Sequence, residues 1–354
     1  MKKKTGCFFH GLCIFELMKR ITIKDLARLL DMSPSTISRA LSDHPDISDS
    51  TKKRVIQLAK ELNYTKNIHA RFFRKQNSGL VALILPEINM FFTPSLIQEI
   101  NKTFTSTNYS LITFLSDDSY EREKEIIHQC LSWAVEGVLL SLSKETSNLN
   151  HLLPLTEAKI KCVLLDKSLE SNNYPSVLID SENASFKAVN YLIKKGHRNI
   201  LGIFGNPTLN ISRKRLNGYK KALQENNIPI LKQNIIFLEE ITNLDFILPS
   251  VLNQHQNITA IFTMSDELLA KSLFHLNQLK YSIPKDISII SISDGMYPYL
   301  VYPQVTHILD SGSKMGEIAS KLLLESIIYN KKKQDYSIVV STKLVELDSV
   351  LKLK

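Results

Sequence analysis

Cysteine is scarce in this sequence, and no apolar run is long enough to cross a membrane. The cysteines are Cys7, Cys13, Cys130 and Cys162, and their spacing matches no metal-binding pattern. Because the sequence has no clear secretory signal either, they are typical of reduced thiols in a cytosolic protein. No stretch approaches the roughly 18 consecutive apolar residues of a membrane span. We therefore expect a cytoplasmic protein with no metal, no cofactor and no membrane partner.

The common motifs of catalysis are missing as well. The sequence contains no Gly-x-Gly-x-x-Gly, no Gly-Lys-Ser/Thr loop, no His-Glu-x-x-His and no Gly-x-Ser-x-Gly. Its nine histidines are dispersed. An α/β fold can host an enzyme without these motifs, so their absence counts only moderately against catalysis. We predict that the protein is not an enzyme.

Positive charge is concentrated near the N-terminus. The net charge is +9, and residues 19–75 contribute +7 of it, from thirteen Lys/Arg and six Asp/Glu. Residues 1–18 add +2, so residues 76–354 sum to zero. A basic module on a neutral body favours contact with a polyanion through that module alone. The alternative is a basic, solvated tail.

The first 17 residues are unlike the rest of the chain. MKKKTGCFFHGLCIFEL has a basic start and an apolar middle, as a signal peptide would, but His10 and Gly11 interrupt it and no small-residue cleavage site follows. The periodic sequence begins at Met18. We predict that residues 1–17 are an extension, either disordered or the product of a mis-assigned start.

Three short helical patterns follow in close succession. Thr22 is expected to cap the first helix with Asp25 as its capping-box partner, and Ser33 to cap the second, with Pro34 at its first position. Ser48 is expected to cap the third. The apolar positions recur at helical spacing and are expected to be buried: Ile23, Leu26, Ala27, Leu30, Ile37, Ala40, Leu41, Val55, Leu58, Ala59 and Leu62. Two short helices with a tight turn, braced by a third, predict a helix-turn-helix.

The second helix has the side chains of a DNA-reading helix. Ser35, Ser38, Arg39 and Ser42 lie on the face opposite its apolar residues. Small hydroxyl residues permit close approach to a major groove, and Arg can bridge guanine O6 and N7. Helix N-termini and hydroxyls can also hold phosphates. The alternative is a small three-helix bundle with an exposed serine-rich face.

This segment also matches a known family. TIKDLARLLDMSPSTISRALSDHPDISDSTKKRVIQLAKELNY resembles the head of the lactose-repressor/galactose-repressor family over its whole length. The matching residues are Thr22, Asp25, Ala27, Ser33, Thr36, Ser38, Arg39, Leu41, Ile47, Ser48, Thr51, Val55, Leu62, Asn63 and Tyr64. The resemblance implies a transcription regulator with operator double-stranded DNA as its partner. The predicted DNA-binding residues of the head are Thr22, Ser33, Pro34, Ser35, Thr36, Ser38, Arg39 and Lys52.

The resemblance continues into TKNIHARFFRKQNSG, where the family has a hinge helix that inserts a leucine wedge into the minor groove. Ala70 and Arg71 match that pattern, but Phe73 stands at the wedge position. An aromatic wedge can still unstack a base step. The alternative is that Phe72 and Phe73 pack against the body. The predicted DNA-binding residues of the hinge are Asn67, Ala70, Arg71, Phe73 and Arg74.

From Gly79 onward, apolar runs of strand length alternate with amphipathic helical stretches. The expected strands are 80–85, 110–115, 137–142, 161–166, 200–205, 234–238, 259–263 and 287–292. The expected helices include 94–105, 121–133, 183–195, 213–224, 266–279 and 314–329. Such alternation predicts parallel sheets covered on both faces, here in two doubly wound lobes with a ligand at the carboxyl ends of the strands.

The body resembles the family's periplasmic-binding-protein-like domain, through PEINMFF, KCVLLDKS, KKGHRNILGIFGNP, SRKRLNGYKKAL, AIFTMSDELLAKSL and PKDISIISISD. The resemblance implies that the chain crosses between the lobes near Ile179, Ile308 and Ser337. The expected fold class is therefore an all-α helix-turn-helix head on an α/β body. The expected domains are 18–66 for the head, 67–78 for the hinge and 79–354 for the body, with lobe one at about 79–178 and 309–337 and lobe two at about 179–308 and 338–354.

Six residues are candidates for effector binding. Asp166 and Asp294 each follow a predicted strand, and Arg215 matches a family position that reaches ligand hydroxyls or carboxylates. The other candidates are Asp266, whose alternative is a helix cap, and Phe91 and Phe92, whose alternative is core packing. The family often has two aspartates where this chain has Ser293-Asp294, so its ligand class can differ.

Together these expectations describe a homodimeric regulator, a repressor in its simplest form. A small molecule between the lobes, a sugar or sugar phosphate by resemblance, would control its affinity for the operator. No heptad repeat follows the last strand-like run at 337–347, so a tail-driven tetramer is not expected. Two alternatives stay open: a sugar-processing enzyme tethered to DNA, and a constitutive structural DNA binder with a vestigial pocket.

Overall fold

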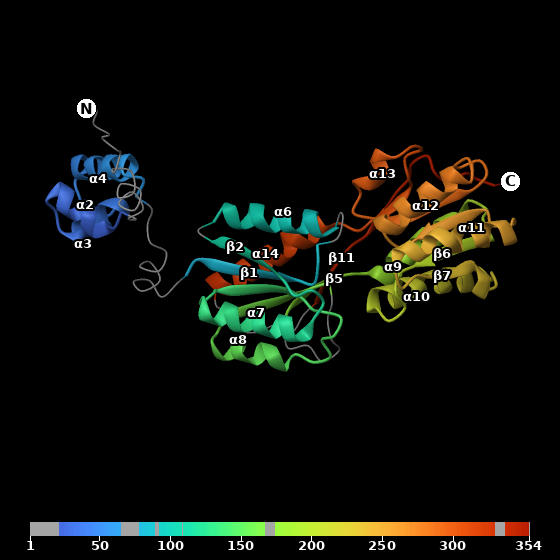
Figure 1. Cartoon of the computed structure of the whole chain (residues 1–354), viewed down its shortest axis with the longest axis horizontal. Coiled ribbons are helices and arrows are strands. Elements are labelled where there is room, and N and C mark those ends of the chain that lie inside the picture. Colours follow the sequence, from blue (N-terminus) through green and yellow to red (C-terminus); the bar gives the residue numbers. More distant parts are fainter. Residues whose placement is uncertain are drawn as a thin grey trace, which may run out of the picture. The chain divides into compact units, whose positions relative to one another are not determined.

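The computed structural model describes residues 21–64, 78–88, 92–107, 109–166, 174–329 and 337–353. By its internal contacts the chain divides into two compact units, Met1–Ser78 and Gly79–Lys354 (Figure 1). Each unit is described by itself below. Among the described helices, none is long and apolar enough to cross a membrane.

Within residues 21–64, the first unit has the helices α2 (Ile23–Leu30), α3 (Pro34–Leu41) and α4 (Asp49–Glu61). Each begins at the predicted cap, because the Thr22, Ser33 and Ser48 side chains each accept a backbone N–H from the first turn. Their apolar stripes meet in one small core. Its fully buried members are Leu26, Ala27, Ile37, Ala40, Val55 and Ala59, with Ile23, Leu30, Leu41, Leu58 and Leu62 packed around them.

The second unit is built on two six-stranded sheets. The first has the strand order β11-β5-β4-β3-β1-β2, and the second β12-β10-β9-β8-β6-β7. All pairs are parallel except β10 with β12. The strands are β1 (Leu80–Leu85), β2 (Ser110–Leu115), β3 (Gly137–Ser141), β4 (Lys161–Leu165), β5 (Ser176–Ile179), β6 (Ile200–Phe204), β7 (Ile235–Phe237), β8 (Ala260–Thr263), β9 (Ser288–Ser293), β10 (His307–Leu309), β11 (Ser337–Val340) and β12 (Lys343–Val345).

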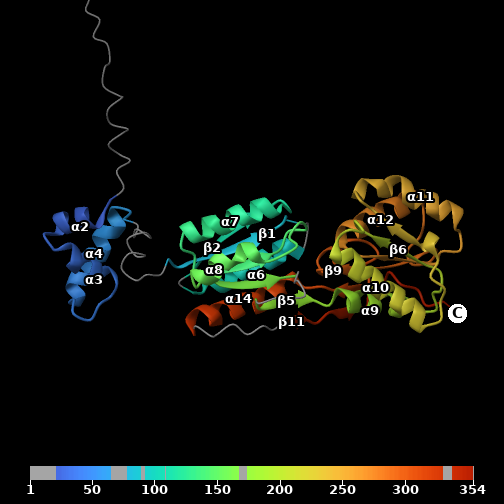
Figure 2. The same ribbon diagram turned by 90° about the horizontal axis from the view of Figure 1, so that it is seen from below.

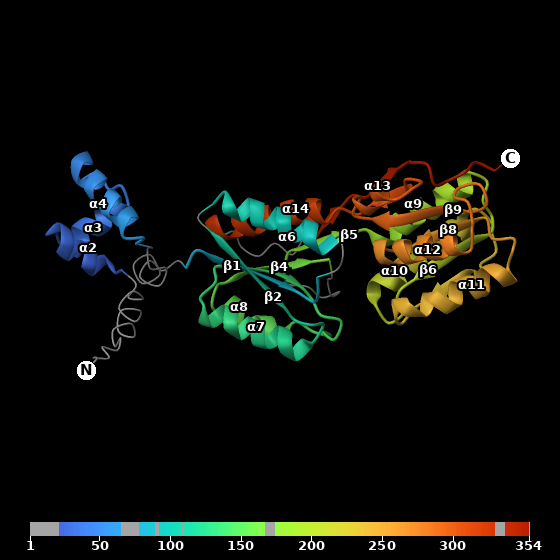
Figure 3. The ribbon, with the colours of Figure 1, turned by 45° about the horizontal axis from the view of Figure 1, so that its top comes forward.

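Helices cover both faces of each sheet. In lobe one, α6 and α14 lie on one face and α7 and α8 on the other (Figures 1 and 3). In lobe two, α11 and α12 lie opposite α9 and α10 (Figures 1 and 2). The helices are α6 (Phe92–Thr105), α7 (Tyr120–Ser132), α8 (Leu153–Glu157), α9 (Ser181–Lys194), α10 (Asn210–Glu225), α11 (Leu244–Gln254), α12 (Asp266–Gln278), α13 (Tyr297–Leu300) and α14 (Gly312–Ile328).

Strand β1, which lies between β3 and β2, shows why a strand covered on both faces has a continuous apolar sequence. Val81, Leu83 and Leu85 belong to the core beneath α6 and α14, whereas Ala82 and Ile84 belong to the core beneath α7 and α8. Because successive strand residues point to opposite faces, a strand covered on both sides needs apolar residues at every position.

Two helix pairs pack at unusually close range, and glycine permits this. A Cβ on Gly218 of α10 would collide with the Glu182 carbonyl oxygen of α9. A Cβ on Gly316 of α14 would lie 2.8 Å from the Leu96 carbonyl oxygen of α6. Both positions therefore require the absence of a side chain.

The third predicted crossing between the lobes occurs, but a few residues later than expected. The expected crossing near Ser337 assigned the residues after 337 to lobe two, but β11 pairs with β5 in the first sheet. The chain leaves lobe one only at 341–342, before β12 joins β10. The strand-like run at 337–347 contains two strands that belong to different sheets. Its apolar pattern does not show where the pairing changes from β5 to β10. The other changes of sheet fall between β5 and α9 and between β10 and α14.

Candidate functional sites

The N-terminal end of α3 is organised by a cluster of hydroxyls. The Ser33 hydroxyl accepts the Thr36 N–H at 3.1 Å and lies 2.7 Å from the Ser35 hydroxyl and 2.8 Å from the Thr36 hydroxyl. Thr22 forms the predicted capping box with Asp25 at the start of α2. Ser33 and Thr22 are therefore helix caps, in addition to the DNA contacts predicted for them.

The outward face of α3 carries Pro34, Ser35 and Arg39, all exposed, with Thr36 and Ser38 half-buried. The Arg39 guanidinium lies 3.8 Å from the Asp46 carboxylate, and both side chains are more than half exposed. A pair this exposed and this long holds the arginine only weakly. Arg39 is consequently available to reach a base edge.

Lys52 was predicted to contact a DNA phosphate, but in the structure its ammonium is already paired with carboxylates. Its ammonium lies 2.7 Å from the Asp43 carboxylate and 3.9 Å from that of Asp49, and its side chain is only 15% exposed. The hydrogen bond and charge of Lys52 lower the pKa of Asp43. A phosphate would have to compete with Asp43 for this ammonium.

The hinge candidates Asn67, Ala70, Arg71, Phe73 and Arg74 lie outside the described residues.

A cavity of about 580 Å³ lies between the two lobes of the body. Lobe one contributes the carboxyl ends of β1, β3, β4 and β5 and the start of α6, and lobe two contributes the loop into α10. This is the edge at which doubly wound sheets bind ligands. Apolar side chains such as Leu142 and Leu209 alternate in the walls with hydroxyls, amides and charged groups.

Two of the effector candidates border this cavity. Asp166 follows β4 directly and has a positive φ of 59°, and its N–H donates to the Val177 carbonyl at 2.9 Å. Phe92 also lines the cavity and packs partly against the core beneath α14. Phe91 lies outside the described residues.

Buried Glu123 of α7 holds the part of the cavity wall that follows β3. Its carboxylate accepts the Ser143 N–H at 2.7 Å and the Thr146 hydroxyl at 2.9 Å, and Ser143 and Thr146 both line the cavity. The His151 imidazole lies 2.8 Å from the same carboxylate, and both side chains are fully buried. This pair was not predicted from the sequence, since two residues on separate helices carry no local signal.

Arg215 is buried beside the cavity rather than in its wall. One guanidinium nitrogen donates to the Met264 carbonyl, and another donates to the Asp310 carboxylate at 2.6 Å. Both side chains are 7% exposed. Burial raises the pKa of Asp310 to about 7, assisted by the charges of Asp166 and Asp294 and opposed by Arg215.

Asp266 and Asp294 form a connected network instead of lining the cavity. The Asp294 N–H donates to the Asp266 carboxylate at 3.3 Å, and the Asp294 carboxylate accepts the Gly312 N–H at 2.7 Å. Gly312 begins α14, so Asp294 ties lobe two to the segment that re-enters lobe one. Burial raises the pKa of Asp294 and raises that of Asp266 to about 6. Ser265, not Asp266, is the cap of α12.

Asp310 was not predicted from the sequence, although it follows a strand just as Asp166 does. The preceding strand β10 has three residues, too few for the apolar pattern to mark it. Because β10 was not predicted, Asp310 was not expected at the carboxyl end of a strand, where the crevice lies.

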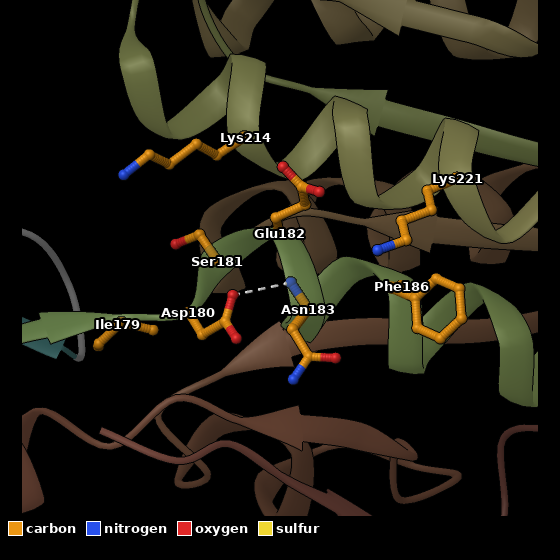
Figure 4. Close-up of a pocket in the computed structure, with 8 residues that line it drawn as sticks. All are labelled: Ile179, Asp180, Ser181, Glu182, Asn183, Phe186, Lys214 and Lys221. Carbon is orange, nitrogen blue, oxygen red and sulfur yellow. Dashed lines mark hydrogen bonds between the residues drawn. The ribbon is translucent and has the colours of Figure 1, made fainter. Parts of the chain in front are cut away.

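A second, smaller pocket of about 410 Å³ adjoins the crossing between β5 and α9 (Figure 4). Asp180 caps α9 by accepting the Asn183 N–H at 3.1 Å, and Lys221 lies 5.6 Å from the ring centroid of Phe186. Lys214 borders both pockets. Carboxylates and ammonium groups share this pocket, so its charge favours no one ligand class.

These features define a class of protein: a helix-turn-helix head joined to a two-lobed α/β body with a cavity between the lobes. Residues 22–67 match the model of bacterial regulatory proteins of the lacI family, and residues 189–350 match that of the periplasmic binding protein-like domain. Catabolite control protein A of Priestia megaterium is 30% identical over 90% of this chain and 96% of its own. The chain belongs to the LacI family of bacterial regulatory proteins, and it is a transcription regulator and not an enzyme.

Solved structures agree with this fold. The lac repressor dimer bound to operator and the anti-inducer ONPF is 19% identical, with a TM-score of 0.79 over 94% of this chain and 100% of that one. The complex of the transcriptional regulator CelR with cellobiose is 21% identical, with a TM-score of 0.66 over 93% of this chain and 100% of that one. The expected fold class is thereby confirmed.

Proposed function

We propose that this protein is a homodimeric, cytoplasmic repressor whose affinity for its operator is controlled by a sugar or sugar phosphate bound between the lobes. The observation that carries the proposal is the cavity whose walls come from both lobes. A ligand there contacts lobe one and lobe two together, so it binds better to one lobe arrangement than to another. A ligand can shift a conformational equilibrium only through such a difference.

The exposed face of α3 supports the DNA-binding half of the proposal. Ser35, Ser38 and Arg39 would enter the major groove, and the capped N-terminus of α3 would face phosphates. The basic charge of residues 19–75 would supply most of the affinity. In the hinge, Asn67, Ala70, Arg71, Phe73 and Arg74 are proposed to contact the minor groove, with Phe73 as the wedge.

The cavity supports the effector half. Thr93, Ser141, Ser181 and Asp166 line the cavity together with aliphatic residues. Sugars present a polar rim and apolar ring faces, and this mixture suits them. CelR binds cellobiose in its structure, which makes carbohydrate the first class to test here.

An exposed apolar segment around α13 supports self-association. Met296, Tyr299, Leu300 and Tyr302 are 64%, 47%, 66% and 99% exposed. Four large apolar or aromatic side chains within seven residues are costly to leave in water. We propose that this segment lies in the dimer interface, because a symmetric interface would cover it on both copies.

The test combines binding of effector with binding of DNA. Thermal unfolding of the full chain is followed with a panel of sugars and sugar phosphates, and each stabilising compound is then added to an operator-binding titration. A compound that stabilises the protein should change operator affinity, and the operator should change compound affinity by the same factor. Turnover of a bound sugar would support the tethered enzyme instead. DNA affinity that no compound alters would support the structural binder.

A further inference from the structure

Gly79 is the residue at which the chain enters the body from the predicted hinge at 67–78. Both of its backbone polar groups are held. Its N–H donates to the Glu136 carboxylate at 2.6 Å, and its carbonyl accepts the Ser110 N–H at 2.7 Å. Its φ of 69° lies in the left-handed region, which favours glycine. A side chain, as well as strand pairing, therefore fixes the direction in which the chain leaves the body.

Glu136 is fixed in turn by other groups of lobe one. Its second carboxylate oxygen accepts the Tyr109 hydroxyl at 3.2 Å, and its backbone N–H donates to the Leu80 carbonyl at 2.8 Å. A hydrogen bond to a carboxylate is shorter and stronger than one to a neutral acceptor. The Glu136 side chain is also half-buried, which limits the competition from water. Glu136 thus holds the Gly79 N–H more firmly than a neutral, exposed side chain would.

Two strands connect this hydrogen bond with the cavity. β1 directly follows Gly79, and β3 directly follows Glu136. The two strands pair in parallel, and every residue of β3 is buried. Their carboxyl ends, at Leu85 and Ser141, line the cavity. Because close-packed interior strands are hard to deform, a displacement of the cavity wall should reach Gly79 and Glu136 as a movement of the whole strand pair.

We propose that Glu136 is a positioning residue for DNA binding: by holding the Gly79 N–H, it passes the position of β1 and β3 at the cavity on to the hinge. This inference rests on the proposed function, because it takes residues 67–78 as the segment that joins the DNA reader to the sensor. Without the carboxylate, Gly79 would regain backbone freedom. That freedom would have to be lost again each time the protein binds DNA, which weakens binding.

The experiment compares DNA binding by the full-length wild type and Glu136→Ala. The probe is a duplex that the wild type enriches from a random-sequence pool. Glu136→Ala should bind this duplex about ten-fold more weakly, the scale set by the entropy of one backbone residue. Hydrogen–deuterium exchange at the Gly79 amide, read by mass spectrometry, should become faster. Glu136→Gln keeps an acceptor oxygen for the Gly79 N–H and should restore both quantities to near the wild-type values.

Asp286→Ala is the matched control, because the Asp286 carboxylate also accepts a backbone N–H at 2.6 Å, from Ser282 in lobe two. It should leave the duplex affinity unchanged, and its thermal unfolding shows what the loss of such a bond does to stability alone. Tyr109→Phe is the second variant if Glu136→Ala does not fold. It frees one carboxylate oxygen of Glu136 and should weaken duplex binding by a smaller factor.

A second measurement follows the connection to the cavity. Coupling between two sites is reciprocal, so duplex binding should change amide exchange at residues 141–146, beside the cavity, in the wild type and not in Glu136→Ala. A change that persists in Glu136→Ala, or that is absent from the wild type, would overturn the proposal. Equal duplex affinity in the wild type and in a folded Glu136→Ala, or equal weakening by Asp286→Ala, would overturn it as well. If the wild type enriches no sequence from the pool, the proposed function itself fails, whereas faster Gly79 exchange with unchanged duplex affinity removes only the role of Glu136.

Discussion

At the scale of single residues, the body of this regulator places several ionisable groups in buried or partly buried positions. Asp310 and Arg215 share one buried pair, and Asp266 and Asp294 share a network at the same end of the lobe. Each such group must be compensated by a partner or by a change of protonation. The stability of this end of lobe two therefore depends on pH as well as on packing.

Stability should report the protonation of Asp310. Its pKa is raised to about 7 in the folded protein, so the folded state binds more protons than the unfolded state between about pH 4 and pH 7. The free energy of unfolding should therefore decrease as pH rises through that window, by a few kcal/mol at most. Asp310→Asn should lack this contribution in urea titrations at successive pH values. Asp348→Asn is the matched control, and an unchanged slope in Asp310→Asn would contradict the raised pKa.

A substitution at Asp166 tests whether effector binding can be lost while DNA binding is kept. Asp166→Ala removes a carboxylate from the cavity wall, while the head contains none of its contacts. The variant should bind operator as the wild type does without effector and should lose about 1–3 kcal/mol of effector affinity. Operator titrations with and without the identified effector measure both quantities. A normal effector response would remove Asp166 from the site.

At the scale of secondary-structure elements, the sequence predicted helices and strands best where their own residues determine them. The Thr22, Ser33 and Ser48 caps and the apolar run of β1 are local signals, and the structure places elements there. Short β10 was missed, and the change of sheet between β11 and β12 was placed a few residues too early, since three or four residues carry no reliable period. Asp310 and Glu123 were missed for a related reason: their importance comes from residues far away in the sequence.

Ser33 tests the contribution of a single cap. Ser33→Ala removes the acceptor for the Thr36 N–H and leaves that donor at the start of α3 without its cap. The head should lose about 1 kcal/mol of stability. Operator affinity should fall with it, because the cap also fixes the N-terminus of the reading helix. Ser33→Asp retains a capping oxygen and should restore the stability seen by thermal unfolding, though its charge would repel DNA.

Glu123 tests the anchoring of the cavity wall by α7. Glu123→Ala removes the acceptor of the buried Ser143 N–H and of the Thr146 hydroxyl, and should lower the free energy of unfolding by about 1–3 kcal/mol. Effector affinity should fall as well, since Ser143 and Thr146 line the cavity. Glu125 lies two residues along the same helix and is exposed, so Glu125→Ala should change stability by no more than about 0.5 kcal/mol. If Glu123→Ala and Glu125→Ala changed stability and effector affinity equally, Glu123 would not be holding the cavity wall.

At the scale of the whole molecule, charge and ligand recognition belong to different units. Residues 19–75 hold +7 of the net charge, and the described cavity lies entirely within Gly79–Lys354. A chain beginning at Ser78 should keep effector binding and lose DNA binding. Operator affinity of the full chain should fall linearly on a plot of log K against log salt, as counterion release requires. Retardation of operator DNA by the truncated chain would contradict this division.

The sheets also have a consequence for the order in which the protein is made. The last strands along the chain, β11 and β12, complete the first and the second sheet respectively. Neither lobe can be finished until the ribosome has released them, whereas the three helices of the head are complete once Tyr64 has emerged. During each round of synthesis the DNA-reading unit therefore exists before the unit that governs it. A chain broken off before Ser337 would carry the folded helices of the head with neither sheet of the body complete.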